Sequence, residues 1–460
     1  MREKYERRCK IQAKAKEVFD WHARPGAFER LTPPWEKVKL VRRVGTITVG
    51  SRVTIKVGIG PFEQTCTFQH IDYCEGVQFR DVQVEGPFKY WDHIHRVEPI
   101  DAEASHLIDS IEYELPLGIL GRLLGGRFVR RKLERMFTYR HRITREDIET
   151  IRRYGDKKMK ILVSGSSGLI GSSLLPMLTA AGHRVISLVR RTPSEQEIFW
   201  DPSAGTIERE KMEGFDAVIH LAGENIADGR WTQEKKNNIR SSRVRSTALL
   251  ADTLAKLAHP PSTFISASAI GYYGNRNSEP LREESDSGSG FLAEVCRDWE
   301  AATATAQEAG IRVINLRIGI VLTPKGGALK QMLLPFELGL GGKLGDGKQY
   351  MSWIALDDLL GAIYHVLMKE ELCGPVNAVS PNPVTNSEFT LTLARVLGRP
   401  ALFPAPRFAL KLALGEMAEE TALASAKVYP SKLLLSDYNF RLPELKDALE
   451  HCLGKVKTAA

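Results

Sequence analysis

The stretch MKILVSGSSGLIG, residues 159–171, decides the fold of most of this chain. Residues 160–164 form a short apolar run that predicts a buried strand, and residues 169–181 predict the helix after it. Three glycines separate the two, in the spacing G-x-x-G-x-x-G. After a strand, the first glycine permits a tight turn, the second lets the backbone approach a phosphate, and the third lets the helix lie close to the strand.

We call residues 165–171 the glycine turn. The amides at the start of a helix are unpaired and carry positive dipole charge, so the turn predicts a site for the pyrophosphate of a dinucleotide. The residues expected to line it are Gly165, Ser166, Ser167, Gly168, Leu169, Ile170 and Gly171.

Beyond the glycine turn, apolar strands alternate with helices. The expected strands are residues 184–189, 217–221, 263–267 and 313–317, and the expected helices lie near residues 232–257 and 291–309. Near-continuous apolar strands that alternate with helices indicate a parallel sheet covered on both faces. The sequence therefore predicts an α/β Rossmann fold, a doubly wound parallel sheet.

The second expected strand ends in two arginines, Arg190 and Arg191. An enzyme that prefers NAD usually carries an acidic residue there, for the ribose 2′-hydroxyl. Guanidinium groups instead form charge-assisted hydrogen bonds to a 2′-phosphate. We therefore expect NADP(H) to be preferred, with NAD(H) as the alternative.

Residues 1–150 follow a different pattern. Alternating runs at residues 52–57 and 77–84 predict strands joined by short turns, which favours an antiparallel sheet. Residues 126–139 predict an amphipathic helix that covers the sheet, and polar residues 149–158 predict a linker.

Charge is uneven along the chain. Residues 1–158 hold 31 Lys+Arg against 23 Asp+Glu, whereas the remainder is balanced at 33 of each. Residues 122–158 hold 13 basic and five acidic residues. Such a run is typical of a surface that binds nucleic acid or of a solvated helix face, and we expect the solvated helix face.

Composition limits the class of protein. No stretch approaches the roughly 20 apolar residues that span a bilayer, so we expect a cytoplasmic protein without a membrane span. The six cysteines are scattered without a CxxC pair, which predicts reduced thiols.

Several further motifs, together with the glycine turn, resemble those of a known protein family. They are residues 218–225 (VIHLAGEN), 229–232 (GRWT), 266–274 (SASAIGYYG) and 333–341 (LLPFELGLG). With the glycine turn, they resemble the atypical extended short-chain dehydrogenase/reductases called the epimerase family, which carry a C-terminal domain of unknown function and are sometimes labelled cell-division-inhibitor homologues. Residues 21–28, 31–35 and 86–93 resemble the START/polyketide-cyclase ligand-binding domain that precedes this part in some members.

The resemblance implies the domain order. A START-like α+β helix-grip domain would span 1–150, a linker 151–158, the Rossmann domain 159–380, and a small C-terminal domain 381–460 would complete the substrate side. Carried over by position, the further cofactor contacts would be Leu221, Ala222, Gly223, Glu224 and Arg243.

The catalytic residues of this chain depart from the pattern of the short-chain dehydrogenase/reductases. Members of the superfamily use a tyrosine, a lysine four residues later and a serine that orients the substrate. Residues 290–300 (GFLAEVCRDWE) contain neither a tyrosine nor a lysine, so the usual pair is missing. The substitutes we expect are Ser268, Tyr272 and Tyr273, and packing of the two tyrosines against the substrate loop is the competing interpretation. Arg297 would either supply positive charge or point to solvent.

In the first domain, His93 and His95 alternate along a strand and therefore share one face. No third ligand has a suitable spacing, so we expect packing or hydrogen bonding within the sheet and no metal. The many aromatic residues of this domain would line either a cavity for a hydrophobic ligand or an ordinary core.

Two functions of different class stay open. One is an NADP(H)-dependent oxidoreductase or epimerase that acts on a small carbonyl or sugar-like substrate. The other is a non-catalytic NADP(H)-binding sensor or regulator, linked to cell division by the family's label, with a lipid-like ligand in its first domain. We expect no nucleic-acid partner, and a homo-oligomer stays open.

Overall fold

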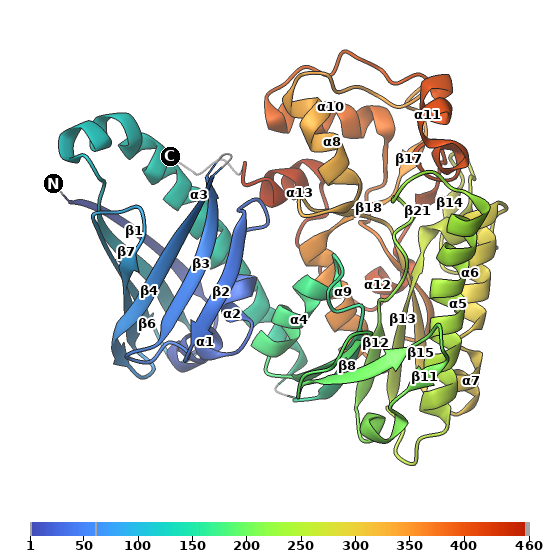
Figure 1. Cartoon of the computed structure of the whole chain (residues 1–460), viewed down its shortest axis with the longest axis horizontal. Coiled ribbons are helices and arrows are strands. Elements are labelled where there is room, and N and C mark those ends of the chain that lie inside the picture. The colour runs from blue at the N-terminus through green and yellow to red at the C-terminus, as the bar shows by residue number, and fades with distance from the viewer. Residues whose placement is uncertain (1, 60–61, 156, 456–460) are drawn as a thin grey trace. The chain divides into compact units, whose positions relative to one another are not determined.

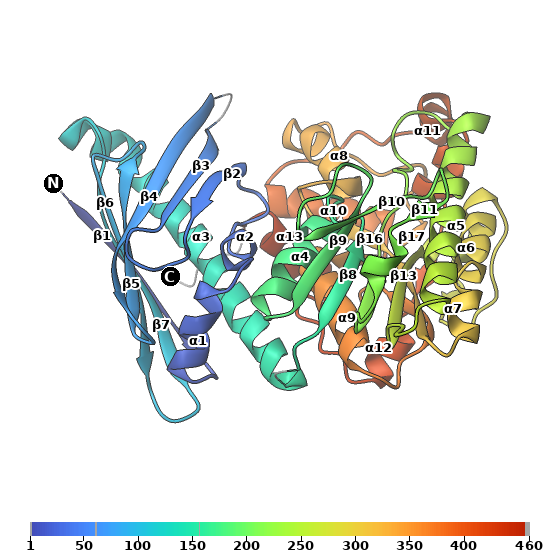
Figure 2. The same cartoon turned by 60° about the horizontal axis from the view of Figure 1, so that its bottom comes forward.

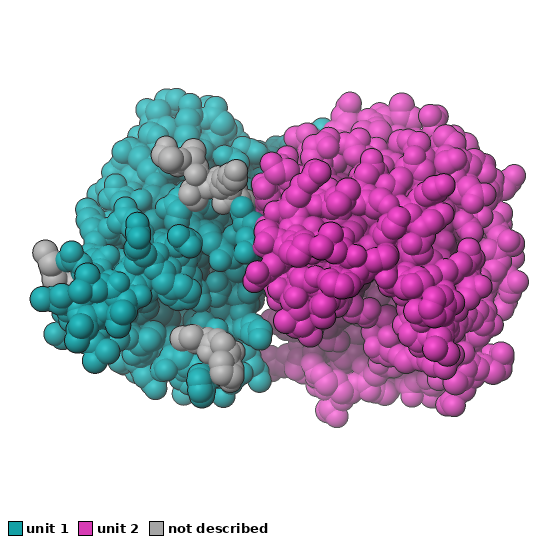
Figure 3. Space-filling model, turned by 90° about the horizontal axis from the view of Figure 1, so that it is seen from above, with its two compact units in different colours: residues 1–157, 176–182, 453–460 teal, residues 158–175, 183–452 magenta. Residues whose placement is uncertain are grey.

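The computed structural model describes residues 2–59, 62–155 and 157–455. They form two compact units, coloured separately in Figure 3. Unit 1 holds residues 1–157, 176–182 and 453–460, and unit 2 holds residues 158–175 and 183–452. The units differ in fold, as the change in sequence pattern at Met159 predicts.

Unit 1 is built on a seven-stranded antiparallel sheet (Figure 1). Its spatial order is β1-β7-β6-β5-β4-β3-β2, so the first and last strands of the unit are neighbours. The strands are β1 (Glu3–Ile11), β2 (Val38–Val44), β3 (Arg52–Ile59), β4 (Phe62–Cys74), β5 (Gln78–Glu85), β6 (Tyr90–Pro99) and β7 (Ser105–Glu114).

Helices α1 (Ala15–Ala23) and α2 (Ala27–Arg30) follow β1, and the long helix α3 (Gly118–Tyr154) follows β7. Leu133 and Phe137 of α3 are buried against aromatic and aliphatic side chains of the sheet, so α3 covers one face of it (Figure 2). This agrees with a helix-grip arrangement.

Helix α3 is longer than the sequence pattern predicts. It starts eight residues before Gly126 because the glycine-rich stretch there is helical, and the backbone passes so close that a Cβ on Gly121 would lie 1.8 Å from the carbonyl oxygen of Pro116. It also continues to Tyr154, so residues 151–154, expected in the linker, are helical. The added C-terminal part is buried at Ile148, which packs in a core cluster of unit 1, whereas the added N-terminal turns are largely exposed.

Three basic residues of α3, Lys132, Arg142 and Arg152, pair with acidic side chains among the described residues. Lys132 Nζ lies 2.9 Å from Glu36, and Arg142 Nε lies 2.6 Å from Glu146. These pairs favour the interpretation of the basic run as a solvated helix face.

Unit 2 contains an eight-stranded sheet in the order β11-β10-β9-β8-β12-β13-β15-β19. All neighbours pair in parallel except β10 and β11. The strands are β8 (Lys160–Ser164), β9 (Arg184–Val189), β10 (Glu197–Asp201), β11 (Thr206–Ile207), β12 (Ala217–His220), β13 (Thr263–Ala269), β15 (Arg312–Ile318) and β19 (Gly374–Ala378). The chain leaves β8 in one direction and returns on its other side at β12, so the predicted doubly wound Rossmann sheet is confirmed and its switch point lies between these two strands.

Helices cover both faces of this sheet (Figures 1 and 2). One face carries α5 (Gln233–Ala255), α6 (Phe291–Ala301) and α7 (Ala304–Glu308), and the other carries α4 (Gly171–Ala180) and α9 (Leu356–Met368). Leu250 and Leu254 of α5 pack with Val218 and Phe264 of the sheet in a buried apolar core. The helix expected over residues 291–309 is divided in two at residues 302–303.

The rest of unit 2 is made of short strand pairs and helices. The strands are β14 (Pro280–Leu281), β16 (Ile320–Leu322), β17 (Tyr350–Met351), β18 (Trp353–Ala355), β20 (Val384–Thr385) and β21 (Lys427–Val428). The helices are α8 (Gly327–Glu337), α10 (Asn386–Leu397), α11 (Arg407–Leu414), α12 (Ser431–Leu435) and α13 (Leu445–Cys452). Trp353 is buried with its indole N–H donating to Asn382, and Asp357 bonds His451 at 2.8 Å.

Among the described residues, no helix has both the length and the apolar character needed to cross a bilayer. The six cysteines are unpaired.

Candidate functional site

Close backbone contacts explain two of the three glycines in the glycine turn. Gly165 has φ of 71°, in the left-handed region, and a Cβ there would lie 2.7 Å from the carbonyl carbon of Leu221. A Cβ on Gly171 would lie 2.2 Å from the carbonyl oxygen of Gly165. These two glycines let β8, β12 and α4 meet.

Gly168 is different. It is exposed, its φ lies outside the left-handed region, and the nearest atom to a Cβ built on it is the Gly165 carbonyl oxygen at 3.2 Å. A side chain at this position would require the protein to shift by only a few tenths of an ångström. The absence of one keeps the outer side of the turn open to a ligand.

The turn also presents unpaired donors. The amide of Gly168 donates to Gly165 at 3.0 Å, and the amide of Ser172 donates to Gly168 at 2.9 Å. In the part of the chain that the structure describes, the amides of Ser166, Ser167, Leu169 and Ile170 donate to no acceptor, and the Oγ of Ser173 is buried without a partner. Amide donors at a helix N-terminus fit an anion such as a pyrophosphate.

A buried histidine joins the two strands at the switch point. His220 lies between Ser164 Oγ, 2.6 Å from its Nδ1, and Ser246 Oγ, 3.2 Å from its Nε2. Because Ser246 donates to Ser242 O, it accepts from Nε2–H, and Ser164 donates to Nδ1. Burial lowers the pKa of His220 to about 3, so the imidazole is neutral. This chain of bonds ties β8, β12 and α5 together beneath the site.

Residues after β12 approach the glycine turn. The backbones of Leu221 and Ala222 lie against Gly165, and Gly223 has no side chain where Arg243 passes, 3.4 Å from the position a Cβ would take. Arg243 donates to the carbonyl oxygens of Ile239 and Glu224, both at 3.0 Å. The structure therefore brings the predicted contacts of β8 and β12 to one edge of the sheet, with Arg243 supporting the loop.

Glu224 is held from two sides. Its backbone amide donates to Ser242 Oγ at 3.0 Å, and its carboxylate accepts a bond from Lys235 Nζ at 2.7 Å. The side chain is therefore already paired within the protein.

The two arginines after β9 differ in their surroundings. Arg190 is exposed and makes no hydrogen bond or ion pair with the described residues. Arg191 forms a two-point ion pair with Glu197, at 2.5 and 2.9 Å. A bond from the Ser194 amide and the Arg191 pair lower the pKa of Glu197 to about 2. Arg191 is thus held in place by a carboxylate that would compete with a phosphate.

The candidate catalytic residues belong to a buried polar network. Ser268 donates to Glu300 Oε1 at 2.7 Å. Arg317, buried on β15, holds both oxygens of Glu300, with Nε 2.8 Å from Oε1 and Nη2 2.9 Å from Oε2. A bidentate pair of this kind fixes the orientation of both side chains.

Tyr273 lies within this network. It is fully buried, it accepts a bond from Arg317 at 2.9 Å, and its hydroxyl lies 2.9 Å from Arg282 O and 2.8 Å from Asn377 Oδ1. Burial raises its pKa to about 12. In this conformation the hydroxyl is saturated and out of reach of a substrate, as the competing packing interpretation requires.

Tyr272 is better placed for chemistry. It is half-buried, and the guanidinium of Arg317 lies 3.5 Å from the centre of its ring. Its hydroxyl has no hydrogen-bond partner within the described ranges, which leaves it free for a ligand.

Sequence reasoning did not single out Glu300 and Arg317. It considered Arg297 instead, whose exposed side chain bonds Ser287 and Gly288 at 3.1 Å. A charged residue within the apolar run of β15 was the available signal for Arg317, because a buried charge requires a partner.

In unit 1 the predicted alternation holds: His93 and His95 lie side by side, with ring centroids 3.7 Å apart. The structure adds two carboxylates from neighbouring strands, Asp81 and Asp109. Neither was expected, because pairing between strands is not visible in the spacing of a single strand.

Comparison with known proteins identifies three regions. Residues 161–377 match the NAD dependent epimerase/dehydratase family, residues 405–452 match a domain of unknown function, and residues 11–137 match the polyketide cyclase/dehydrase and lipid transport family.

Three similar proteins span different parts of the chain. An epimerase family protein of Mycobacterium bovis is 42% identical over 290 residues, covering 63% of this chain and 96% of the relative. A nucleoside-diphosphate sugar epimerase from Corynebacterium glutamicum is 34% identical, with a TM-score of 0.80 over 98% of this chain and 90% of that one. The human epimerase family protein SDR39U1, solved with NADPH, is 34% identical, with a TM-score of 0.60 over 65% of this chain and all of that one.

Proposed function

This chain belongs to the NAD dependent epimerase/dehydratase family, and we propose from that premise that it binds NADP(H) at the glycine turn. The observation that carries the proposal is the set of unpaired amides at the switch point, next to a glycine whose missing side chain leaves the approach open. A bound dinucleotide would lay its pyrophosphate on these amides and extend past Leu221 toward the buried polar network.

We assign binding of the 2′-phosphate of NADP(H) to Arg190 and Arg191. Arg190 is free to contact it, and Arg191 can share its guanidinium between Glu197 and the phosphate. The presence of NADPH in the human relative's structure supports the same preference. NAD(H) is the weaker ligand in this proposal, since no acidic residue replaces the arginines.

The reaction that the site supports best is hydride exchange between NADP(H) and a small carbonyl or sugar-like compound. The cofactor supplies the hydride when bound. Tyr272 is the residue we place against the reacting oxygen, because its hydroxyl is free. Ser268 and Tyr273 position the site through Glu300 and Arg317.

A non-catalytic sensor of NADP(H) is the second candidate. The missing tyrosine–lysine pair and the saturated hydroxyl of Tyr273 favour it. Unit 1, which matches a lipid transport family, would then bind a hydrophobic ligand.

Calorimetry tests the cofactor proposal. We expect NADPH and NADP⁺ to bind the full-length protein more tightly than NADH and NAD⁺. Replacing Arg191→Ala should weaken the phosphorylated forms by roughly tenfold or more, the worth of one charge-assisted hydrogen bond, and leave the others nearly unchanged.

A matched control is Arg184→Ala, an exposed arginine at the other end of the same strand, β9. This variant should bind all four nucleotides with the affinity of wild type. No heat with any of the four nucleotides would refute cofactor binding, and equal losses of NADPH and NADH affinity in Arg191→Ala would refute the assignment of the 2′-phosphate.

A further inference from the structure

Unit 1 contains a cluster of ionisable side chains in the middle of its sheet. The side chains come from three neighbouring strands: Asp81 from β5, His93 and His95 from β6, and Asp109 from β7. In the strand register Asp81 lies opposite His93, and His95 lies opposite Asp109. Asp81, His93 and Asp109 are each at least nine-tenths buried, so their charges are compensated inside the protein.

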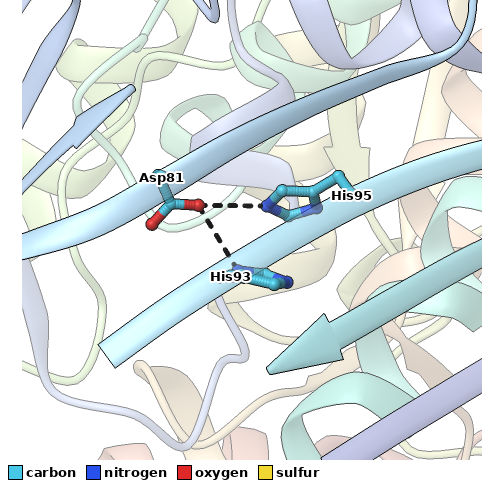
Figure 4. A group of neighbouring side chains, drawn as sticks. All are labelled: Asp81, His93 and His95. Atoms are coloured by element: carbon cyan, nitrogen blue, oxygen red, sulfur yellow. Dashed lines mark ion pairs between the residues drawn. The ribbon is translucent and has the colours of Figure 1, made fainter. Parts of the chain in front are cut away.

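Three ligand atoms converge on one side of the cluster (Figure 4). Asp81 Oδ2 lies 3.5 Å from His93 Nδ1 and 3.4 Å from His95 Nε2. Metal bonds of about 2.0–2.1 Å in tetrahedral geometry place ligand atoms about 3.4 Å apart. Both distances from the Asp81 oxygen match this spacing, and all three ligand atoms lie within 4.8 Å of one another.

A second carboxylate orients both imidazoles. Asp109 Oδ1 lies 2.9 Å from His93 Nε2 and 2.7 Å from His95 Nδ1, which are the ring nitrogens that face away from Asp81. Its other oxygen lies 2.5 Å from His141 Nε2 of α3. Histidines that bind metals almost always donate their second N–H to a carboxylate or carbonyl, which fixes the ring and raises its basicity.

A further histidine stands beside the cluster. His70 of β4 lies opposite Asp81 in the strand register. It is nine-tenths buried, and its Nδ1 has no hydrogen-bond partner in the described part of the chain. An unpaired imidazole nitrogen in this position suits a metal-bound water, or the metal itself after a rotation of the side chain.

We propose that Asp81, His93 and His95 form a binding site for a divalent transition metal of the zinc class, with Asp109 as the residue that positions the two histidines. Three protein ligands leave a coordination position for water or for an oxygen of a bound molecule, as in catalytic zinc sites. Such a cation would neutralise the two buried carboxylates and could polarise a carbonyl group of a ligand held by unit 1.

The competing state is a network of protons alone. Each nitrogen of His95 faces a carboxylate oxygen, so an imidazolium at this position would satisfy the same geometry without a metal. Only the first state contains a metal ion, so measuring the metal content of the protein separates the two.

The experiment uses the full-length protein, stripped with a chelator and then titrated with Zn²⁺ or Co²⁺. We expect one tightly bound ion per chain by elemental analysis, and visible absorption bands of tetrahedral Co²⁺. Asp81→Asn keeps the size of the side chain but removes its charge, and it should abolish stoichiometric binding. Asp109→Asn should weaken binding by about 10–100-fold while retaining the three ligands.

His259→Gln, at an exposed histidine of unit 2, is the control for adventitious binding and should leave the titration unchanged. Far-UV circular dichroism of each variant checks that the sheet has formed, and a variant that is unfolded is replaced by His95→Gln. Failure of the folded wild-type protein to bind either ion, or equal binding by wild type and folded Asp81→Asn, would overturn the metal site and leave the proton network.

Discussion

Replacing Gly168→Ala should separate cofactor binding from folding. A Cβ at this position has a single neighbour within 4 Å, the carbonyl oxygen of Gly165 at 3.2 Å, and the backbone there is not left-handed. A shift of a few tenths of an ångström accommodates it. We therefore expect the free energy of unfolding to change by less than about 1 kcal/mol.

The same methyl group stands on the open side of the turn, where a pyrophosphate would contact the unpaired amides. Loss of one or two charge-assisted hydrogen bonds costs about 1.5–3 kcal/mol, which raises the dissociation constant of NADPH roughly 10–100-fold. Isothermal calorimetry measures the affinity, and urea unfolding measures the stability.

Gly171→Ala provides the contrast. Its Cβ would lie 2.2 Å from Gly165 O and 2.8 Å from Ser166 Cα, so backbone must move, and we expect a loss of about 1–3 kcal/mol of stability as well as of affinity. Ser172→Ala, at an exposed position of the same helix, should alter neither. The reasoning fails if Gly168→Ala binds NADPH within twofold of wild type, or if both glycine variants lose equal stability.

Three further predictions concern unit 2. Tyr272→Phe should lower NADPH-dependent turnover of an accepted carbonyl compound about 100-fold or more without altering cofactor affinity, and turnover that survives in this variant contradicts the assignment of Tyr272. Tyr273→Phe should instead lower the free energy of unfolding by about 1–3 kcal/mol, because it leaves buried groups unpaired. Glu300→Gln should destabilise the protein by about 3 kcal/mol in urea because the buried arginine loses its counter-charge, and Glu294→Gln on the exposed side of the same helix should have little effect; equal effects would argue against the network. The stability that depends on neutral His220 should be lost as the pH falls from about 6.5 toward about 3, because only the unfolded state takes up the proton in this range. The free energy of unfolding of His220→Asn should therefore depend less on pH than that of wild type. Parallel pH curves for the two proteins would contradict this.

The Rossmann part of the fold could be predicted from sequence because its signals are local. The apolar run of β8, the glycine turn and the first helix lie within about twenty residues, and strand after strand repeats the pattern. The meeting of the segments that we propose as cofactor contacts could be predicted for the same reason: parallel strands place their carboxyl ends at a common edge, so motifs that follow β8 and β12 meet there.

The length of α3 could not be predicted in this way. Glycines at its start lower its intrinsic helix propensity, yet it spans Gly118–Tyr154. In its C-terminal part, Ile143 and Ile148 are buried, and this packing favours the helix there, whereas residues 118–125 are largely exposed.

By itself, the sequence determined where the glycine turn must form, because a strand, three spaced glycines and a helix follow one another directly. Only the tertiary structure decided which polar residues share a site. Ser268, Glu300 and Arg317 meet from two strands and a helix, and Asp81, His93 and Asp109 meet across three strands. The physical reason is that burying a charge is costly unless a partner is adjacent, and the fold brings those partners together from positions far apart in the chain.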